Sequence, residues 1–235
     1  MALDLHLWMP NRMAECMRIT VKNRREAGFT TLEMLVVIAM SVIITAIAVP
    51  TYVNTTAYLR AAGDLRTINS LVGQAKMRAA AGFTHARVYA DLTGNAYQLQ
   101  VWSKTANGGE GCWFADTDPT GACLTYGGGQ PSGESYVLAQ GDTFGLGGLT
   151  SGPTPGQTTM AQAAPCLDNG GSSVGSTACV VFNSRGIPID NTGAPVATGA
   201  FYLTNGKIVD GVTVSATGSI QAWSSPLGAA NWQAQ

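Results

Sequence analysis

The sequence has few charged residues and few histidines, and both shortages limit its chemistry. Asp, Glu, Lys and Arg make up 11% of the 235 residues, and only two histidines are present. Beyond residue 28 the one histidine is His85, so a Ser-His-Asp arrangement has no second imidazole to use. Asp116 and Asp118 lie in a Pro-Gly loop, where a solvated turn is the simpler interpretation. We therefore predict that the protein is not an enzyme and needs no cofactor.

Motifs for nucleotide and metal binding are incomplete as well. Gly145-Leu146-Gly147 lacks the third glycine of a dinucleotide fingerprint and has no strand-then-helix context. The cysteines beyond residue 28 lack the short Cys-x-x-Cys steps of a four-cysteine zinc site. Asp116 and Asp118 offer oxygen ligands for calcium, but two carboxylates are too few to define a site. No metal site is predicted, and calcium binding is left open.

One long apolar run stands out from this background. Residues 34–49 contain no charge, and Thr30 to Val49 has about the length that crosses a hydrocarbon core. Three basic residues lie between positions 22 and 25, and such a flank stays cytoplasmic. We therefore expect a single-pass inner-membrane protein whose remaining chain forms a periplasmic head.

Glu33 is the anomaly at the start of this run. A charge within a membrane segment costs roughly 2.5 to 3.5 kcal/mol on insertion scales, so such a residue is a functional candidate. The simpler alternative is a carboxylate that reaches the membrane interface from a helix end.

The residues around Glu33 carry a resemblance. Gly28-Phe29-Thr30-x-x-Glu33, placed after a basic leader, resembles the processing signal of type IV pilins and type II secretion pseudopilins. The resemblance implies cleavage by a prepilin peptidase between Gly28 and Phe29, and N-methylation of Phe29. It also implies that Glu33 pairs with the Phe29 amine of a neighbouring subunit, with other major and minor pilins as partners. The expected final location is a pilus or pseudopilus at the cell surface.

The chain is expected to begin with a leader, residues 1–28, that is excluded from the fold. Met13 and Met17 are alternative starts, and a leader from Met17 is the more compact one. Removal of the leader leaves a mildly acidic mature chain with eight basic and eleven acidic residues. Such a chain is not an obvious electrostatic partner for nucleic acid.

One long helix, about 30 to 81, is predicted after the leader. Residues 29–50 form its membrane or filament-core half, and residues 51–82 form an amphipathic half with apolar positions at three- and four-residue steps. Pro50 predicts a kink or local melting between the halves, because proline removes a helical hydrogen bond. Gly82 is the expected stop.

Residues 83–235 are predicted to form a β-rich head, so the fold class is α+β with the helix on an antiparallel sheet. Residues 87–92 and 95–104 predict a hairpin, with Val88, Ala90, Tyr97, Leu99 and Val101 facing inward. A loop-rich region follows, about 105 to 178, with 135–140 as its only clear strand. Strands are then expected at 179–183, 200–204, 207–209, 212–216 and 219–225, with Asn205-Gly206 as a two-residue turn.

The last strands carry a second resemblance, over roughly 180 to 221. Val181-Phe182-Asn183-Ser184-Arg185-Gly186, a Tyr-Leu strand and Val212-Thr213-Val214-Ser215-x-x-Gly218 are similar to the C-terminal module of FimT/GspH-type minor pilins and pseudopilins. Members of that group linked to DNA uptake carry Gly-Arg-x-Arg there, whereas this chain has Gly218-Ser219-Ile220-Gln221. Arg185 and Lys207 alone make a thin basic patch, so nucleic acid is an unlikely but open partner.

The mature chain keeps four cysteines, Cys112, Cys123, Cys166 and Cys179, in a compartment that is predicted to be oxidising. Three pairings are possible, and we favour Cys112–Cys123 with Cys166–Cys179, because each pair brackets a Gly-rich loop. Trp113 and Trp232 are the tryptophans expected to contact a partner.

These features lead to one main hypothesis and two alternatives. The first is a minor pilin that primes a type IV pilus and displays a tip surface. The second is the equivalent type II secretion pseudopilin, which would contact exported proteins. The third is a tip module that binds DNA or a host surface. The long decorated loops favour the first.

Overall fold

The structure is a computed structural model that describes residues 28–126, 135–157 and 159–235. The expectations for the leader up to residue 27, including its alternative starts, lie outside the described residues. The chain divides into two compact units, one ending at Ile47 and one running from Ala48 to Gln235. Each unit is described by itself.

Helix α1 spans Thr31–Ala81, close to the predicted range of about 30 to 81. Pro50 lies inside the helix, and the residues on both sides of it are helical. The expected local melting at Pro50 therefore does not occur, and a kink there stays a prediction. The backbone can tolerate this proline because it breaks one hydrogen bond in a helix that keeps many others.

The helix ends next to the predicted glycine, although Gly82 does not adopt the left-handed conformation itself. The Gly82 N–H donates to the Arg78 carbonyl at 2.9 Å, and the Thr84 N–H donates to the Ala79 carbonyl at 3.1 Å. Phe83, between them, has the positive φ of 47°. These bonds satisfy carbonyls at the end of the helix, as a C-terminal cap does.

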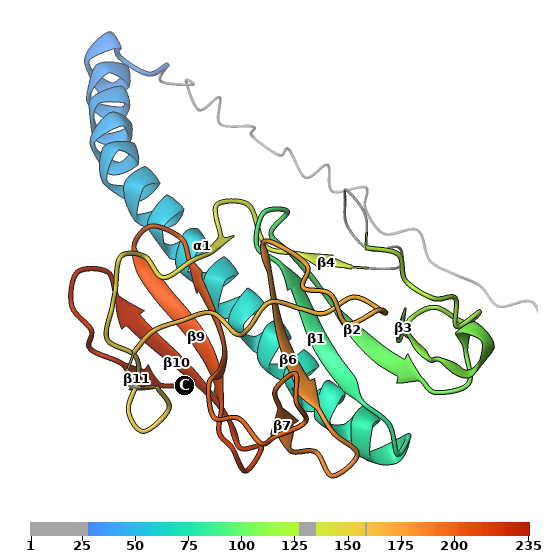
Figure 1. Cartoon of the computed structure of the whole chain (residues 1–235). Coiled ribbons are helices and arrows are strands. Elements are labelled where there is room, and N and C mark those ends of the chain that lie inside the picture. The colour runs from blue at the N-terminus through green and yellow to red at the C-terminus, as the bar shows by residue number, and fades with distance from the viewer. Residues whose placement is uncertain (1–27, 127–134, 158) are drawn as a thin grey trace, which may run out of the picture. The chain divides into compact units, whose positions relative to one another are not determined.

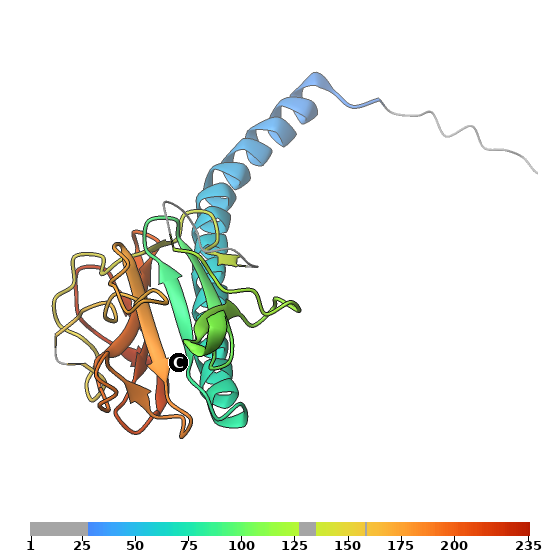
Figure 2. The same ribbon diagram turned by 45° about the vertical axis from the view of Figure 1, so that its right-hand side comes forward.

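The second half of α1 buries one stripe of small and apolar side chains. These residues recur at three- and four-residue steps, so they share one face of the helix. Figures 1 and 2 show this half of α1 along one face of the strands. The stripe consists of Ala61, Leu65, Ile68, Leu71, Val72, Ala75 and Ala79. Together with strand residues it forms the main core, which confirms the general α+β layout.

The first sheet has the order β3-β2-β1-β6-β7, with β4 also pairing with β2. The predicted hairpin is confirmed, since β1 and β2 are antiparallel and Val88 lies opposite Leu99. The strands are β1 (Ala86–Asp91), β2 (Ala96–Ser103), β3 (Cys112–Ala115), β4 (Tyr136–Val137), β6 (Thr177–Phe182) and β7 (Pro188–Ile189).

The second sheet has the order β11-β10-β9-β8-β5. The strands are β5 (Thr143–Phe144), β8 (Gly199–Thr204), β9 (Ile208–Val214), β10 (Ile220–Pro226) and β11 (Gln233–Ala234). The predicted turn at Asn205-Gly206 is confirmed, and the Asn205 side chain accepts the backbone N–H groups of Lys207 and Ile208. The prediction of separate strands at 207–209 and 212–216 is wrong, because β9 runs unbroken through Asp210 and Gly211.

The region from 105 to 178 contains more structure than expected. Besides β3 and β5 it includes the short 3-10 helix η1 (Asn107–Gly109), and the strand predicted at 135–140 is only the two-residue β4. Strands of two to four residues contain too few alternations to show a period of two in the sequence. Their pairing is set by the neighbouring strands instead.

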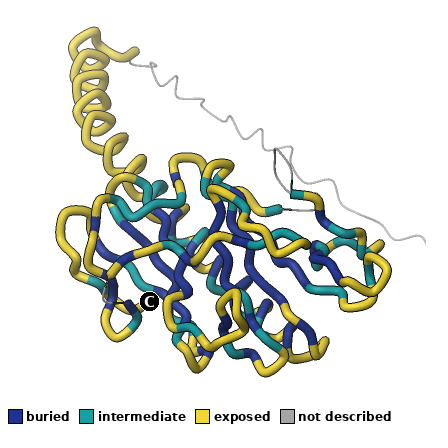
Figure 3. The backbone as a smooth tube through the Cα atoms, in the orientation of Figure 1, coloured by how far each residue is buried: buried dark blue, intermediate teal, exposed yellow. Residues whose placement is uncertain are grey.

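The five alternate positions of the hairpin predicted to face inward all belong to the main core. The opposite face of the hairpin is buried too, which the alternation of polar residues did not predict. Arg87, Gln98 and Gln100 are each at most 1% exposed. Figure 3 shows β1 and β2 as dark blue, buried segments. Loops therefore cover the outer face of the first sheet, and these loops form the site described below.

The two glycines of the C-terminal resemblance meet in the structure. Gly186 and Gly218 have φ values of 71° and 77°, and a Cβ added to Gly218 would lie 2.4 Å from the Gly186 carbonyl oxygen. The ammonium of Lys76, from the helix, donates to the Gly218 carbonyl at 2.9 Å. The β6–β7 and β9–β10 turns are thus packed against each other and tied to α1.

We expect Gly218→Ala to destabilise the head strongly. The substitution combines a left-handed backbone with overlap on a backbone oxygen, for a loss of roughly 2 to 5 kcal/mol in unfolding free energy. Gly206→Ala is the matched control, because Gly206 has a φ of 78° but no atom within 4 Å of an added Cβ. Urea unfolding of the full chain in detergent micelles measures both. Equal losses in the two variants would contradict the proposed contact.

Candidate functional site

The predicted processing site lies at the start of α1. Phe29 lies two residues before the helix and is 78% exposed. The Thr30 backbone N–H and hydroxyl each donate to Glu33 Oε2 at 3.3 Å, and the Glu33 N–H donates to Thr30 Oγ1 at 3.2 Å. This reciprocal pair is a capping box, which satisfies backbone donors that a helix start otherwise leaves unpaired.

The capping box gives Glu33 a local role that sequence reasoning missed. The signal was available, because Thr30-x-x-Glu33 before an apolar run has the spacing of this motif. Glu33 therefore has one observed role, as a cap of its own helix. Its second role is an expectation: the resemblance assigns its charge to subunit pairing. Glutamine also serves as the third residue of such a box, so the two functions can be tested independently.

The helix beyond Glu33 is long and apolar enough to span a membrane. Every residue from Thr31 to Ile47 is exposed in the structure, including large side chains such as Leu35, Ile43 and Ile47. A continuous apolar surface of this length is not stable in water and needs lipid or other apolar helices around it. This supports membrane anchoring by a single helix.

The structure contains two disulfides, Cys112–Cys123 and Cys166–Cys179. This is the local pairing that the sequence favoured. Each bond ties a loop of the 105–178 region to a strand of the first sheet, β3 in one case and β6 in the other. Both loops then extend over the outer face of that sheet.

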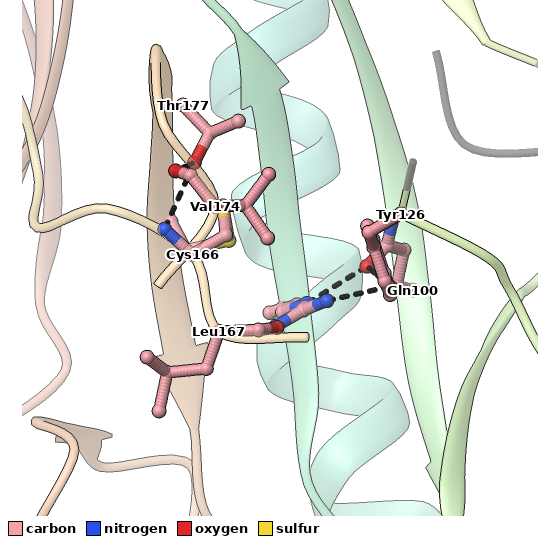
Figure 4. Close-up of a disulfide and its surroundings, with 8 residues drawn as sticks. Gln100, Tyr126, Cys166, Leu167, Val174 and Thr177 are labelled. Atoms are coloured by element: carbon pink, nitrogen blue, oxygen red, sulfur yellow. Dashed lines mark hydrogen bonds between the residues drawn. A yellow bond between two sulfur atoms is a disulfide. The ribbon is translucent and has the colours of Figure 1, made fainter. Parts of the chain in front are cut away.

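Arg87 lies at the point where the two loops meet. Its guanidinium donates three hydrogen bonds: to Gln100 Oε1 at 2.7 Å, to the Tyr126 hydroxyl at 2.7 Å and to the Leu167 carbonyl at 2.6 Å. Figure 4 labels the three acceptor residues, Gln100, Tyr126 and Leu167, together with Cys166 of the second disulfide. The side chain from β1 thereby joins β2 to both disulfide-bonded loops.

Aromatic rings pack against the charged guanidinium of Arg87. The guanidinium carbon lies 3.9 Å from the centre of the Trp113 ring and 5.5 Å from that of Tyr126. No ion pair among the described residues involves Arg87, although the charge of Asp168 acts on its guanidinium at longer range. Burial lowers the pKa of Arg87 to about 10, which still leaves the group charged at neutral pH. Cation–π contact and hydrogen bonds to neutral oxygens therefore stabilise this cation.

A cavity of about 460 Å³ lies next to this cluster. Its walls include Trp102, Val181 and residues of two loops, 164–171 and 188–199. This volume is within the range of small-molecule sites, which bury a ligand between apolar walls and a few polar groups. The cavity could not be predicted from the sequence, because its walls come from segments as far apart as His85 and Gly199.

Other predicted residues have structural roles. Trp113 was expected to contact a partner, but it is 6% exposed and stacks on Arg87, so that expectation is wrong. Trp232 is half-buried, donates from Nε1 to the Ser151 carbonyl and packs against Tyr202. His85 is exposed at the edge of the cavity; burial of its ring and then the charge of Lys104 lower its pKa, so it is neutral at pH 7.

The two aspartates considered for calcium are used locally. Asp116 forms an ion pair with Arg78 at 2.9 Å, and Asp118 accepts hydrogen bonds from Thr120 and Ala122 within its own turn. Within the described ranges, no group of three or more His, Cys, Asp or Glu side chains is placed to hold a metal ion.

The two residues of the thin basic patch also differ in their surroundings. Arg185 is exposed in the β6–β7 turn, whereas the ammonium of Lys207 donates to the side chain of Asn54 on α1. Ser219, at the position of the missing arginine, donates its N–H to Ser215 within the turn. Neither contact adds positive charge to this end of the head.

Comparisons with protein-family models, with curated proteins and with solved structures found no match.

We expect Arg87→Lys to destabilise the head although it keeps the charge. A lysine ammonium cannot reach all three acceptors of the planar guanidinium, and a lost hydrogen bond to a charged group costs about 1.5 to 3 kcal/mol. Arg185→Lys, at an exposed position, is the control and should change the unfolding free energy by less than about 0.5 kcal/mol. Urea unfolding with the disulfides intact measures both variants. An unchanged midpoint for Arg87→Lys would show that Arg87 does not organise the two loops.

Proposed function

We propose that this protein is a FimT/GspH-type minor pilin of a type IV pilus. It is processed by a prepilin peptidase, primes filament assembly and displays the surface of its head near the tip. The observation that carries the proposal is the segment Gly28-Phe29-Thr30-x-x-Glu33 at the start of an exposed apolar helix. The same helix continues into an α+β head, which agrees with the architecture that the resemblance implies.

The proposed mechanism is assembly rather than catalysis. The exposed apolar surface of residues 31–47 keeps the subunit in the inner membrane until it is recruited. Extraction into a filament replaces lipid contacts by contacts with the helices of other subunits. Because both environments are apolar, the transfer removes little hydrophobic stabilisation, and polar groups then determine the register.

Glu33 is the polar group proposed to set that register. Cleavage after Gly28 creates a new positive charge on the Phe29 amine, four residues before the carboxylate. In an apolar bundle both charges are unfavourable unless they are paired, so the pair favours one alignment of neighbouring subunits. The hydrogen bonds from Thr30 hold the Glu33 carboxylate at the helix start before assembly.

The alternative is a type II secretion pseudopilin, whose processing and assembly follow the same physical steps. The extended region of the head from 105 to 178, closed by two disulfides, favours a displayed surface and therefore the pilus. DNA binding by the head is less favoured, because Ser219 and Gln221 stand where DNA-uptake members carry arginine.

The processing step predicts a defined mass change. In cells with a prepilin peptidase, the protein purified from membranes should begin at Phe29 and carry one methyl group on the amine. In cells that lack the peptidase, the uncut chain should be found. Intact-mass analysis measures both forms. An uncut chain in both strains would contradict the pilin proposal and leave a single-span anchored domain.

The register function predicts a difference between two variants. Glu33→Gln keeps a capping side chain but removes the charge, whereas Thr30→Ala removes the cap and keeps the charge. We expect Glu33→Gln to be cleaved normally but to lose most of its incorporation into sheared filaments, and Thr30→Ala to retain it. Quantitative immunoblotting of sheared filaments against membranes measures the ratio. Equal incorporation of Glu33→Gln and wild type would show that Glu33 acts only as a cap.

A further inference from the structure

The cavity beside Arg87 has the size and the mixed lining of a ligand site. It has a volume of about 460 Å³ and lies over the ends of β1 and β6, on the face of the first sheet opposite α1. Arg87 and Trp113 of the cluster line it, together with residues of the segments 164–171 and 188–199. Because Cys166–Cys179 and the Arg87–Leu167 bond fix the first loop, this side of the cavity is held in place without a ligand.

Two carboxylates in these loops give the cavity walls a negative charge. Asp168 Oδ1 accepts the N–H groups of Gly170 and Ser172, at 2.9 and 2.8 Å. Asp190 Oδ1 accepts from the hydroxyl and the N–H of Thr192, at 2.7 and 2.8 Å. Each turn fixes its carboxylate through Oδ1, and both residues line the cavity. We take their Oδ2 oxygens as the acceptors for a ligand.

The charges around the cavity disfavour an anionic ligand. Asp168 and Asp190 repel an anion at the walls, and the nearby imidazole of His85 is neutral at pH 7. The hydrogen bonds from Thr192 lower the pKa of Asp190, so its carboxylate stays charged well below neutral pH. The positive charge of Arg87, which also lines the cavity and interacts with Asp168, offsets part of this negative charge.

Part of the remaining wall is apolar and aromatic. Trp102 is half-buried and lines the cavity together with Val181, Pro188 and Ile189. Gly111 fixes the position of the Trp102 ring, since an added Cβ would lie 2.6 Å from it. An indole ring held in this way offers a flat surface to the C–H groups of a ligand.

We infer that this cavity binds a neutral saccharide unit. Such a ligand has hydroxyl groups that donate to fixed carboxylate oxygens, an apolar C–H face that packs on an aromatic ring, and no net charge. The Asp168 and Asp190 oxygens select the hydroxyl groups, and the Trp102 wall selects the C–H face. The balance of charges selects a ligand without net charge. The inference goes beyond the assembly role proposed above, because it assigns a ligand to the displayed head.

Ligand-observed NMR tests the inference on the full-length chain. The protein is held in a detergent without a sugar headgroup, and saturation-transfer signals are recorded for the methyl glycosides of glucose, galactose, mannose and N-acetylglucosamine. We expect a saturable signal for at least one of them, strongest at the C–H groups that pack on Trp102. Inorganic phosphate and lysine methyl ester serve as the anionic and cationic probes.

Two aspartate variants provide a matched comparison. Asp190→Asn keeps the Oδ1 acceptor of its turn and removes the free carboxylate oxygen, so we expect the affinity for the bound glycoside to fall about fivefold or more. Asp118 accepts from Thr120 and Ala122 in a turn of the same kind but does not line the cavity. Asp118→Asn should bind as the wild type does.

Three results would overturn the inference. They are the absence of a saturable signal for all four glycosides, an equal loss of affinity in the two aspartate variants, and displacement of the glycoside by phosphate or lysine methyl ester. The processing assay gives an independent answer, because a correctly cleaved chain that binds no glycoside refutes only the saccharide site. An uncut chain that binds a glycoside would refute only the filament role.

Discussion

The packing of one helical stripe against the strands is the constraint on which the head depends. The buried face of α1 is made largely of small residues, and Ala61, Ala75 and Ala79 are fully covered. Small side chains let the helix approach the strands closely, so that Leu65 and Ile68 reach the inner faces of β1, β2 and β6. Lys76 extends the contact to the turns at Gly186 and Gly218. These contacts fix the inner face of the first sheet. Contacts of a different kind cover its outer face.

The outer face is organised by a buried cation instead of an apolar cluster. The Arg87 guanidinium donates hydrogen bonds to acceptors on β2 and on two loops, and the Trp113 ring packs against it. Two disulfides hold these loops near their acceptor positions, which reduces the conformational entropy lost when the loops are ordered. The cost of burying a charge is offset only while all three acceptors are present. The cluster therefore couples the positions of both loops, and through them the shape of the cavity.

The two ends of the molecule serve different purposes in the proposed function. The first unit carries the proposed processing signal and a helix that is long and apolar enough to span a membrane. The head carries the charged and aromatic features to which we assign a ligand. Because the head is folded around residues from Ala61 onward, its core does not use the apolar run. A subunit built in this way can change its surroundings from lipid to protein while its head stays unchanged.

Local sequence patterns predict the features that depend on neighbouring residues. The apolar run, the helix from about 30 to 81, the β1–β2 hairpin and the Asn205-Gly206 turn follow from local periodicity and turn chemistry, and the structure agrees with each. The tertiary structure alone decided that Arg87, Gln98 and Gln100 are buried, since their alternation with apolar residues is typical of an exposed face. Loops from distant parts of the chain cover that face, and the two-residue strands pair only because longer strands lie beside them. No local pattern records such long-range contacts, so the Arg87 cluster and its cavity became visible only in the folded chain.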